Sequence, residues 1–452
     1  MKRRFALAAY VIAGSVAYAQ QNDGSSRVDS LMTRWATARS PGAAVVVIHN
    51  GTVVHAKGYG LGNLTTGEPI GPTTVFDIAS VAKQFTAMAT MMLVERGQLR
   101  YGDSLSAFFP EFKGDLRRIT VRQLLSHTSG IMDYTTVWGE TSKRADKTPR
   151  TNDNVVRFLA HQRLRFRPGA RWEYSNSNYV LLAQIIGTVS GEPFATFVRE
   201  HILQPLGMND SFVYDGQSGR GARATGYVSR GNGFRPVARN AENYVTGDGL
   251  INSTVEDLVK WDQALDHEKL VKAVTLRDAF SPGQLNDGTP LTYGFGWGLG
   301  RFRGARTESH GGETDGFVAQ ITRIPEQHFT VIVLSNNEQF PPLYAIANKI
   351  ADIYLANDLK APPATPLAPQ RLRDYAGRYA LYDLVLHVDV DHGELWLTPP
   401  TRHRVRLIPA SGEEFLIEGT HGASSVGFNR NARGRVTCLT LLDQNGTTLC
   451  KQ

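Results

Sequence analysis

Ser80 and Lys83 stand three residues apart at the start of an apolar run, "IASVAKQFTAMAT", at residues 78–90. Residues three apart on a helix share a face, so the two side chains are expected to meet. A helix that is apolar nearly all round is buried, and burial disfavours the charged form of a lysine. A lysine shifted toward its neutral form can accept the serine's proton, which makes the two a candidate nucleophile and base. The alternative is that Ser80 only caps the helix and that Lys83 extends to solvent.

A second group of polar residues, Tyr174 and Asn176, directly precedes another apolar run. A tyrosine beside a lysine can hold the phenolate form or share a proton with the lysine. The amide of Asn176 can orient the lysine and donate an N–H to a substrate carbonyl. The alternative is an aromatic core residue, with Ser175 or Asn176 as a helix cap.

A third group, His310-Gly311-Gly312, leads into a strand-like run. Two glycines without side chains allow a substrate backbone to approach the strand edge closely. The backbone N–H of Glu313 then becomes a candidate oxyanion donor, beside the N–H groups at the N-terminus of the helix that carries Ser80. The alternative is a plain turn with His310 in solvent.

The pattern of apolar residues predicts the elements that must hold these groups in place. Strand-like runs lie at both ends of the first 356 residues, helical runs lie between them, and Asn50-Gly51 predicts a tight hairpin. A capping box is predicted for the helix at 251–265, with Ser253 as cap and Glu256 three residues on. This order indicates an α+β fold with helices packed on an antiparallel sheet. The strand-like runs cover 42–64, 293–302 and 317–337, and a further helix is predicted at 342–355.

The chain beyond this region changes character. Residues 357–370 are rich in proline and have no core pattern, which is typical of a linker. Short alternating runs with glycine turns follow at 371–452 and predict a small antiparallel barrel or sandwich. The chain's two cysteines, Cys438 and Cys450, flank a hairpin-like turn there. A disulfide between them is possible, but sequence does not set the register of the hairpin.

Taken in order, the three polar groups resemble the motifs of the penicillin-recognising serine hydrolases. That superfamily contains class C β-lactamases, D-specific peptidases and esterases related to β-lactamases. The resemblance covers roughly residues 25–355, and it implies a hydrolase domain at 25–356 with an antiparallel sheet, flanking helices and a helical subdomain. The matching motifs are Ser80-Val-Ala-Lys83, Tyr174-Ser-Asn176 and His310-Gly-Gly312, and the segments 124–131 and 247–261 also look like family segments.

The resemblance implies a role for each matching residue. Ser80 is expected to be acylated, and Lys83 with Tyr174 to transfer protons, without a decision on which of the two is the base. The remaining roles are substrate binding by Asn176, His310, Gly311 and Gly312, and an oxyanion hole from the N–H groups of Ser80 and Glu313.

The motif departs from class C β-lactamases at one position. Those enzymes typically carry lysine where this chain has His310, and a neutral histidine brings less charge to a substrate carboxylate. We therefore expect hydrolysis of an ester or a peptide amide, by an esterase or a D-amino-acid peptidase. A β-lactamase and a catalytically silent penicillin-binding-like protein are the alternatives. His127 is interpreted as structural, because no G-x-S-x-G turn is present to pair it with a serine.

The N-terminus has the pattern of an exported protein. Three of the first four residues are basic, an apolar stretch follows, and "AYA" at 17–19 fits a cleavage site after Ala19. Residues 1–19 are therefore expected to be a signal peptide, and the mature chain to be periplasmic or secreted. Beyond this segment, no apolar run is long enough to cross a membrane.

Composition limits the partners of the chain. The net charge is +7, from 49 Lys and Arg against 42 Asp and Glu, and falls to 46 − 42 = +4 without residues 1–19. The basic residues are scattered and form no stripe with interleaved aromatics, so nucleic-acid binding is not expected. Cysteine and histidine do not occur at metal-ligand spacing, so no metal or cofactor is expected either. A small ester, amide or peptide is the expected substrate, and the oligomeric state is left open.

Overall fold

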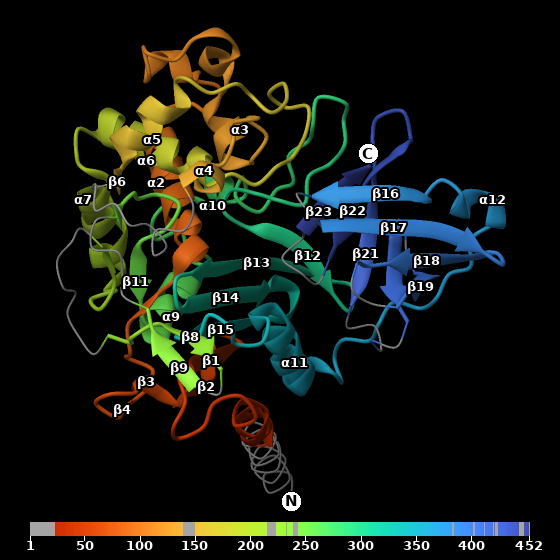
Figure 1. The fold of residues 1–452 in the computed structure, drawn as a ribbon, viewed down its shortest axis with the longest axis horizontal. Helices are drawn as coiled ribbons and strands as arrows, with labels where there is room; N and C mark the ends of the chain where they lie inside the picture. The colour runs from red at the N-terminus through yellow and green to blue at the C-terminus, as the bar shows by residue number, and fades with distance from the viewer. Residues whose placement is uncertain are drawn as a thin grey trace, which may run out of the picture.

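The computed structural model describes residues 23–451, apart from 139–149, 215–222, 232, 238–242, 382–383, 401–402, 411, 419, 421–423 and 443–446. The predicted signal peptide at 1–19 lies outside the described residues. Figure 1 shows an α+β domain, with the C-terminal barrel beside strand β12. No single described helix is long and apolar enough to cross a membrane. Two helical stretches meet that criterion only together, as a bent pair, Asn176–Ser190 and Phe194–Leu206.

A six-stranded antiparallel sheet forms the centre of the first domain, in the order β12-β13-β14-β15-β1-β2. The predicted hairpin joins β1 to β2, and both turn residues, Asn50 and Gly51, have positive φ angles of 52° and 72°. The run predicted as a strand from 293 begins only at Gly298, because Gly296 turns the chain with a φ of 78°. The strands are β1 (Ala43–His49), β2 (Thr52–Tyr59), β12 (Gly298–Phe302), β13 (Ala305–Thr314), β14 (Phe317–Ile324) and β15 (Phe329–Ser335).

Helices cover both faces of this sheet. Helix α11 (Leu343–Leu355) and a helix at residues 23–32 pack on one face, where their side chains share a core with β1 and β15. The opposite face packs on α2 and α9, and the helical subdomain lies beyond α2. The helices on that side are α2 (Lys83–Glu95), α3 (Val121–Leu125), α4 (Thr135–Trp138), α5 (Asn152–Leu159), α6 (Asn176–Ser190), α7 (Phe194–Val198), α8 (Gln204–Leu206), α9 (Val255–Ala264) and α10 (Ala273–Leu276).

Short elements connect these layers. Single-turn helices occur at η1 (Ala79–Ala82), η2 (Leu105–Ala107), η3 (Gly114–Arg118), η5 (Arg199–Leu203) and η6 (Pro325–Gln327). The short strands are β3 (Leu61–Asn63), β4 (Glu68–Pro69), β5 (Phe76–Asp77), β6 (Arg150–Thr151), β7 (Phe212–Val213), β8 (Tyr227–Arg230), β9 (Gly233–Pro236), β10 (Asn243–Tyr244) and β11 (Ile251–Ser253).

The predicted cap of helix α9 is wrong by one residue. Ser253 is the last residue of β11 and pairs with Phe76, so its backbone belongs to a strand. Thr254 caps the helix instead, and its hydroxyl accepts the backbone N–H of Asp257 at 3.0 Å. Ser253 and Thr254 are equally good caps by residue type, and strand pairing decides between them.

A buried ion cluster ties α9 to the sheet behind the predicted site. The guanidinium of Arg323 in β14 bonds Asp262 at 2.7 Å, Glu308 at 2.9 Å and Asp266 at 2.6 Å. Glu308 lies in β13, two residues before His310. Removing Asp262 or Glu308 would leave a buried charge uncompensated, so the cluster joins β13 and β14 to α9.

The C-terminal domain is a closed barrel of eight antiparallel strands, which decides between the predicted barrel and sandwich. Tyr375, Phe415 and Phe428 pack together with aliphatic side chains in its interior. Cys438 and Cys450 lie opposite each other on neighbouring strands and form a disulfide. The strands are β16 (Gly377–Leu381), β17 (Leu384–Asp391), β18 (Glu394–Thr398), β19 (Val405–Pro409), β20 (Glu414–Ile417), β21 (Ser425–Arg430), β22 (Val436–Leu441) and β23 (Thr447–Lys451), preceded by α12 (Pro369–Leu372).

Polar contacts join the barrel to the edge of the first domain. The carbonyl of Leu442 accepts the backbone N–H of Arg301 in β12 at 3.0 Å. The side-chain amide of Asn429 donates to the carbonyl of Pro290 at 3.0 Å. These contacts cover part of the open edge of β12 and join the start of β23 to the segment before β12, where the hydroxyls of Thr448 and Thr292 share a hydrogen bond.

Candidate active site

Ser80 lies on a strained turn at the end of β5. The predicted helix at 78–90 is divided, because η1 carries Ser80 and α2 begins at Lys83. Ala79, directly before the serine, has a φ of 46°, in the left-handed region that an alanine rarely adopts. Its backbone N–H is held by Asp77 Oδ1 at 2.9 Å. Strain of this kind costs on the order of 1–3 kcal/mol and persists only where neighbouring contacts impose it.

Lys83 is fully buried and faces the serine. Its Nζ donates to Ser80 Oγ at 3.0 Å, to Asn176 Oδ1 at 2.8 Å and to the carbonyl of Asp248 at 2.8 Å. Burial lowers the pKa of Lys83 from 10.5 to about 8, against the opposing charges of Asp248 and Asp133. The alternative in which Lys83 extends to solvent is therefore wrong.

Tyr174 stands over the same lysine as a neutral phenol. Lys83 Nζ lies 4.9 Å from the centre of the Tyr174 ring. Burial raises the pKa of Tyr174 well above its ordinary value, and a hydrogen bond with Ser80 opposes this shift only in part. Of the two possibilities considered for this tyrosine, the phenolate is therefore disfavoured, because burial penalises the anion.

Asn176 is the first residue of α6, and Ser175 makes no capping bond with its side chain. The Oδ1 atom of Asn176 accepts from Lys83, as expected for a residue that orients the lysine. Its Nδ2 atom donates to Asp133 Oδ2 at 2.9 Å. This bond uses one of the two N–H donors of the amide, so the expected bond from Asn176 to a substrate carbonyl stays a prediction.

His310 is buried in β13 and bonded on both ring nitrogens. The carbonyl of Gly311 lies 2.6 Å from Nδ1 and can only accept, so Nδ1 carries the proton. Nε2 then accepts from the hydroxyl of Tyr293 at 2.9 Å. Burial, followed by the charge of Lys83, lowers the pKa of His310 to about 3. The histidine is neutral as expected, and its one ring N–H is bonded to the neighbouring carbonyl of Gly311.

Gly312 is the point where β13 meets the serine turn. A Cβ atom at this position would lie 2.5 Å from the carbonyl oxygen of Ile78 and 3.0 Å from the backbone nitrogen of Ser80. The close approach that glycine permits here is therefore to the chain's own turn. The N–H groups of Ser80 and Glu313, on the two elements that meet, stay the predicted oxyanion donors.

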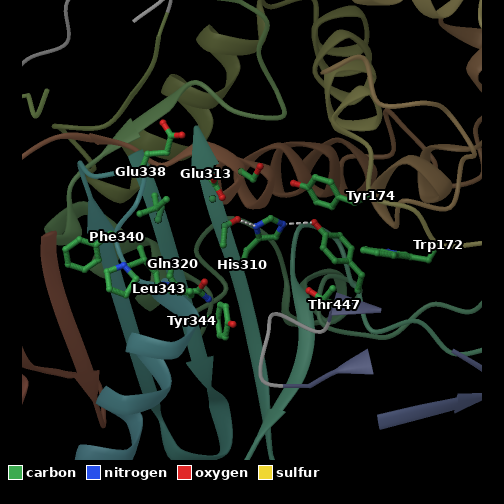
Figure 2. Close-up of a pocket in the computed structure, with 18 residues that line it drawn as sticks. Trp172, Tyr174, His310, Glu313, Gln320, Glu338, Phe340, Leu343, Tyr344 and Thr447 are labelled. Carbon is green, nitrogen blue, oxygen red and sulfur yellow. Dashed lines mark hydrogen bonds between the residues drawn. The ribbon is translucent and has the colours of Figure 1, made fainter. Parts of the chain in front are cut away.

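These residues open into a cleft of about 460 Å³ (Figure 2). Tyr174 and Trp172 lie on one side of His310, and Phe340 and Leu343 lie on the other. Among the described lining residues, Glu313 and Glu338 are the charged ones, and none is a lysine or an arginine. The cleft is lined by Ser80, Trp172, Tyr174, Tyr293, His310, Gly311, Gly312, Glu313, Val318, Ala319, Gln320, Glu338, Phe340, Pro341, Pro342, Leu343, Tyr344 and Thr447.

Comparison with known proteins decides the family. The model of the family described as "Beta-lactamase" matches residues 28–355, which is most of the chain. The chain belongs to the β-lactamase family. Its fold and its ordered motifs agree with a serine hydrolase of this family, whose substrate the comparisons leave undetermined.

Relatives of this β-lactamase-family hydrolase extend beyond the first domain. Penicillin-binding protein 4* of Bacillus subtilis (strain 168) is 32% identical over 399 residues, covering 81% of this chain and 88% of the relative. The octameric penicillin-binding protein homologue from Pyrococcus abyssi superposes with a TM-score of 0.64 at 25% identity, covering 94% of this chain and 99% of that one. The D-amino acid amidase from Ochrobactrum anthropi SV3, complexed with L-phenylalanine amide, shares the fold at a TM-score of 0.62 and 23% identity, covering 75% of this chain and 97% of that one.

Two buried aspartates of this family member were missed by sequence reasoning. Asp133 Oδ2 accepts both the backbone and side-chain N–H of Asn176, at 3.1 and 2.9 Å. Asp248 Oδ2 accepts the hydroxyl of Tyr134 at 2.9 Å, and burial raises the pKa of Asp248 to about 6. Asp248 lies inside a segment that looked like the family, and Asp133 lies two residues beyond another, which was the available signal.

Among the residues that the structure describes, no group of three or more His, Cys, Asp or Glu side chains is arranged to hold a metal ion. The polar groups around Ser80 bond one another instead, through Lys83, Asn176 and Asp133.

Proposed function

We propose that this chain hydrolyses an ester or a peptide amide through an acyl-enzyme on Ser80. The observation that carries the proposal is the bond of 3.0 Å between Lys83 Nζ and Ser80 Oγ at the wall of the cleft. A lysine with a pKa of about 8 is partly neutral at pH 7 and can act as a base for the serine hydroxyl.

The first half of the reaction forms the acyl-enzyme. Ser80 Oγ attacks the substrate carbonyl carbon while its proton passes to neutral Lys83. The tetrahedral oxyanion is stabilised by the N–H groups of Ser80 and Glu313. Collapse breaks the bond to the leaving alcohol or amine, which takes a proton from the Tyr174 phenol, and Lys83 returns a proton to Tyr174.

The second half returns the enzyme to its starting state. A water molecule attacks the acyl carbonyl and gives its proton to neutral Lys83. Collapse of the tetrahedral intermediate then breaks the bond to Ser80 Oγ, which takes that proton from Lys83 as the acid product leaves. Asn176, held by Asp133, keeps Lys83 pointed at the serine throughout. Because burial holds Tyr174 in its phenol form, we assign the base to Lys83 and the donor to Tyr174.

Substrate charge is the property on which this cleft is expected to discriminate. Glu313 and Glu338 line it, and His310 is neutral. A carboxylate placed beside such groups is repelled, whereas a neutral ester or an amino-acid amide is not. The D-amino acid amidase that shares the fold supports the amide option, and penicillin-binding protein 4* supports the alternative of a penicillin-binding-like protein.

A panel of substrates tests the function and its alternatives. We expect kcat/KM on a nitrophenyl ester and on D-phenylalanine amide to exceed that on a chromogenic cephalosporin by at least about tenfold, or about 1.4 kcal/mol. The matched control is the methyl ester of the same cephalosporin, which lacks the carboxylate and should react faster than the free acid. Fastest turnover of the free cephalosporin would make the chain a β-lactamase, and no turnover of any substrate would support the catalytically silent alternative.

Export forms part of the proposal. The basic start, the apolar stretch and "AYA" at 17–19 support removal of residues 1–19 during secretion. Expressed with its own N-terminus in a Gram-negative host, the mature protein should begin at Gln20 by N-terminal sequencing of the periplasmic fraction. A chain that keeps Met1 and stays in the cytoplasmic fraction would contradict export.

A further inference from the structure

His127 is a buried histidine beside the proposed site that the proposed mechanism does not use. It is fully inaccessible to solvent and has a φ of 56°, in the left-handed region. It does not line the cleft, and it follows α3 on the loop that leads toward Asp133. A buried titratable side chain on a strained backbone is costly to keep, so its contacts should show what it does.

The first contact fixes the tautomer of the ring. His127 Nδ1 lies 3.2 Å from the backbone N–H of Ser175 and 3.1 Å from the side-chain amide of Asn178. Both are donors, so Nδ1 is unprotonated and the proton lies on Nε2. Within the described part of the chain, Nε2 has no hydrogen-bond partner.

The second contact is with the ring of Tyr174. The two ring centres lie 4.4 Å apart at an angle of 33°, and the ring of Tyr293 lies 4.9 Å from His127 on a steeper plane. The carbonyl of His127 accepts the backbone N–H of Glu173 at 3.0 Å. One residue therefore holds the backbone on both sides of Tyr174 and packs against its ring.

We propose that His127 is a positioning residue for Tyr174. It holds the Tyr174 ring in the place where the phenol contacts Ser80 and Lys83. This inference rests on the proposed function, in which Tyr174 passes a proton to the leaving group. His127 acts through backbone and ring contacts and exchanges no proton itself, because its Nε2 has no hydrogen-bond partner among the described residues.

The environment keeps this arrangement constant with pH. Burial, the charge of Lys83 and the nearby His310 lower the pKa of His127 well below its ordinary value. Charged or titratable groups that face the ring are Lys83, Tyr174, Tyr179, Tyr293 and His310. Nδ1 therefore remains an acceptor for Ser175 wherever the enzyme is active.

Two substitutions separate the two contacts. His127→Phe keeps a ring against Tyr174 and loses the acceptor for Ser175, whereas His127→Asn loses the ring and keeps an acceptor at the position of Nδ1. A misplacement of about 1 Å in a reacting group can cost 10²-fold, so we expect His127→Phe to lower kcat by about 10- to 100-fold with little change in KM. His127→Asn should lose less than about tenfold, as partial rescue by the remaining acceptor.

The decisive measurement repeats each substitution in a Tyr174→Phe background. If His127 acts through Tyr174, its replacement should change kcat on a nitrophenyl ester by less than about twofold once the phenol is gone. A merely structural histidine would cause the same loss in both backgrounds. Equal losses, or wild-type kcat in His127→Phe, would overturn the inference.

Two further results keep this test distinct from that of the function. If His127→Phe does not fold, as shown by the lack of a cooperative unfolding transition, the double-mutant cycle is made with His127→Asn and Tyr174→Phe. The same criterion then decides the outcome. If the wild-type chain hydrolyses neither esters nor amides, the proposed function has failed and this inference falls with it. If the wild-type chain is active, a lack of coupling overturns only the role of His127.

Discussion

Ser80→Ala is expected to lower kcat by at least about 10⁴-fold on every ester and amide that the wild-type chain hydrolyses. The serine oxygen is the atom that becomes acylated, and Lys83 Nζ lies 3.0 Å from it. Without that oxygen, Lys83 has no serine proton to accept and no acyl-enzyme can form. The rate that remains should come only from binding and from the oxyanion donors, which persist when a nucleophile is removed.

Covalent labelling gives the direct measurement. A fluorophosphonate reagent should add to the wild-type chain on the peptide that contains Ser80, detected by mass spectrometry, and should not label Ser80→Ala. Ser190→Ala is a matched control, because Ser190 lies at the opposite end of α6 from Asn176, about 20 Å away along the helix. Labelling that persists in Ser80→Ala would place the nucleophile elsewhere and refute the mechanism.

The central contact of this site was predictable because it is local. A spacing of three residues brings Ser80 and Lys83 to one face, and the apolar residues after Lys83 predict its burial. The left-handed turn at Ala79 was not predictable, because an alanine gives no signal for a positive φ. That turn is imposed by Asp77 and by the contact of Gly312 with the serine turn.

Partners that arrive from distant parts of the chain were the main omissions. Asp248 meets Lys83 across 165 residues, and Asp133 meets Asn176 across 43. No spacing rule links residues so far apart, so these contacts depend on how the helical subdomain packs. The bond of His310 to Tyr293 is tertiary in the same sense, whereas its bond to Gly311 joins neighbouring residues, and together the two bonds occupy both ring nitrogens.

The architecture was easier to predict than its details. Alternating apolar residues and the Asn50-Gly51 turn were enough for the hairpin and for an α+β fold, because each depends on local pattern. Barrel and sandwich could not be separated, since closure depends on the pairing of β16 with β23. The disulfide depended on the same kind of information, because the register of β22 and β23 places Cys438 opposite Cys450.

The second large effect is expected at Lys83. Lys83→Met should lower kcat/KM by about 10²- to 10⁴-fold, the range that a general base contributes. Methionine has similar length and fits a buried site, but it cannot accept a proton. Lys83→Arg is the matched control for charge, because it keeps a cation that does not lose its proton at any working pH. Both variants should show a loss of this size if the neutral lysine is the reactive form.

The pH dependence shows whether activity rises or falls as Lys83 loses its proton. Burial lowers the pKa of Lys83 from 10.5 to about 8, so the neutral fraction at pH 7 is about one tenth, against roughly 3 in 10,000 at the ordinary value. The wild-type kcat/KM should therefore rise about tenfold per pH unit below pH 8 and level off above it. Steady-state kinetics between pH 5.5 and about 9.5 would show this rise in kcat/KM. A neutral ester is used because the substrate itself does not titrate in that range.

The same profile distinguishes a base from a simple electrostatic group. If Lys83 acted only as a cation that stabilises the oxyanion, activity would fall as pH rises through 8, and Lys83→Arg would keep most of it. If it acts as the base, activity rises through pH 8, and neither Lys83→Met nor Lys83→Arg retains the ascending limb. A flat pH profile in the wild type, together with substantial activity in Lys83→Met, would show that another group is the general base and would contradict the role proposed for Lys83.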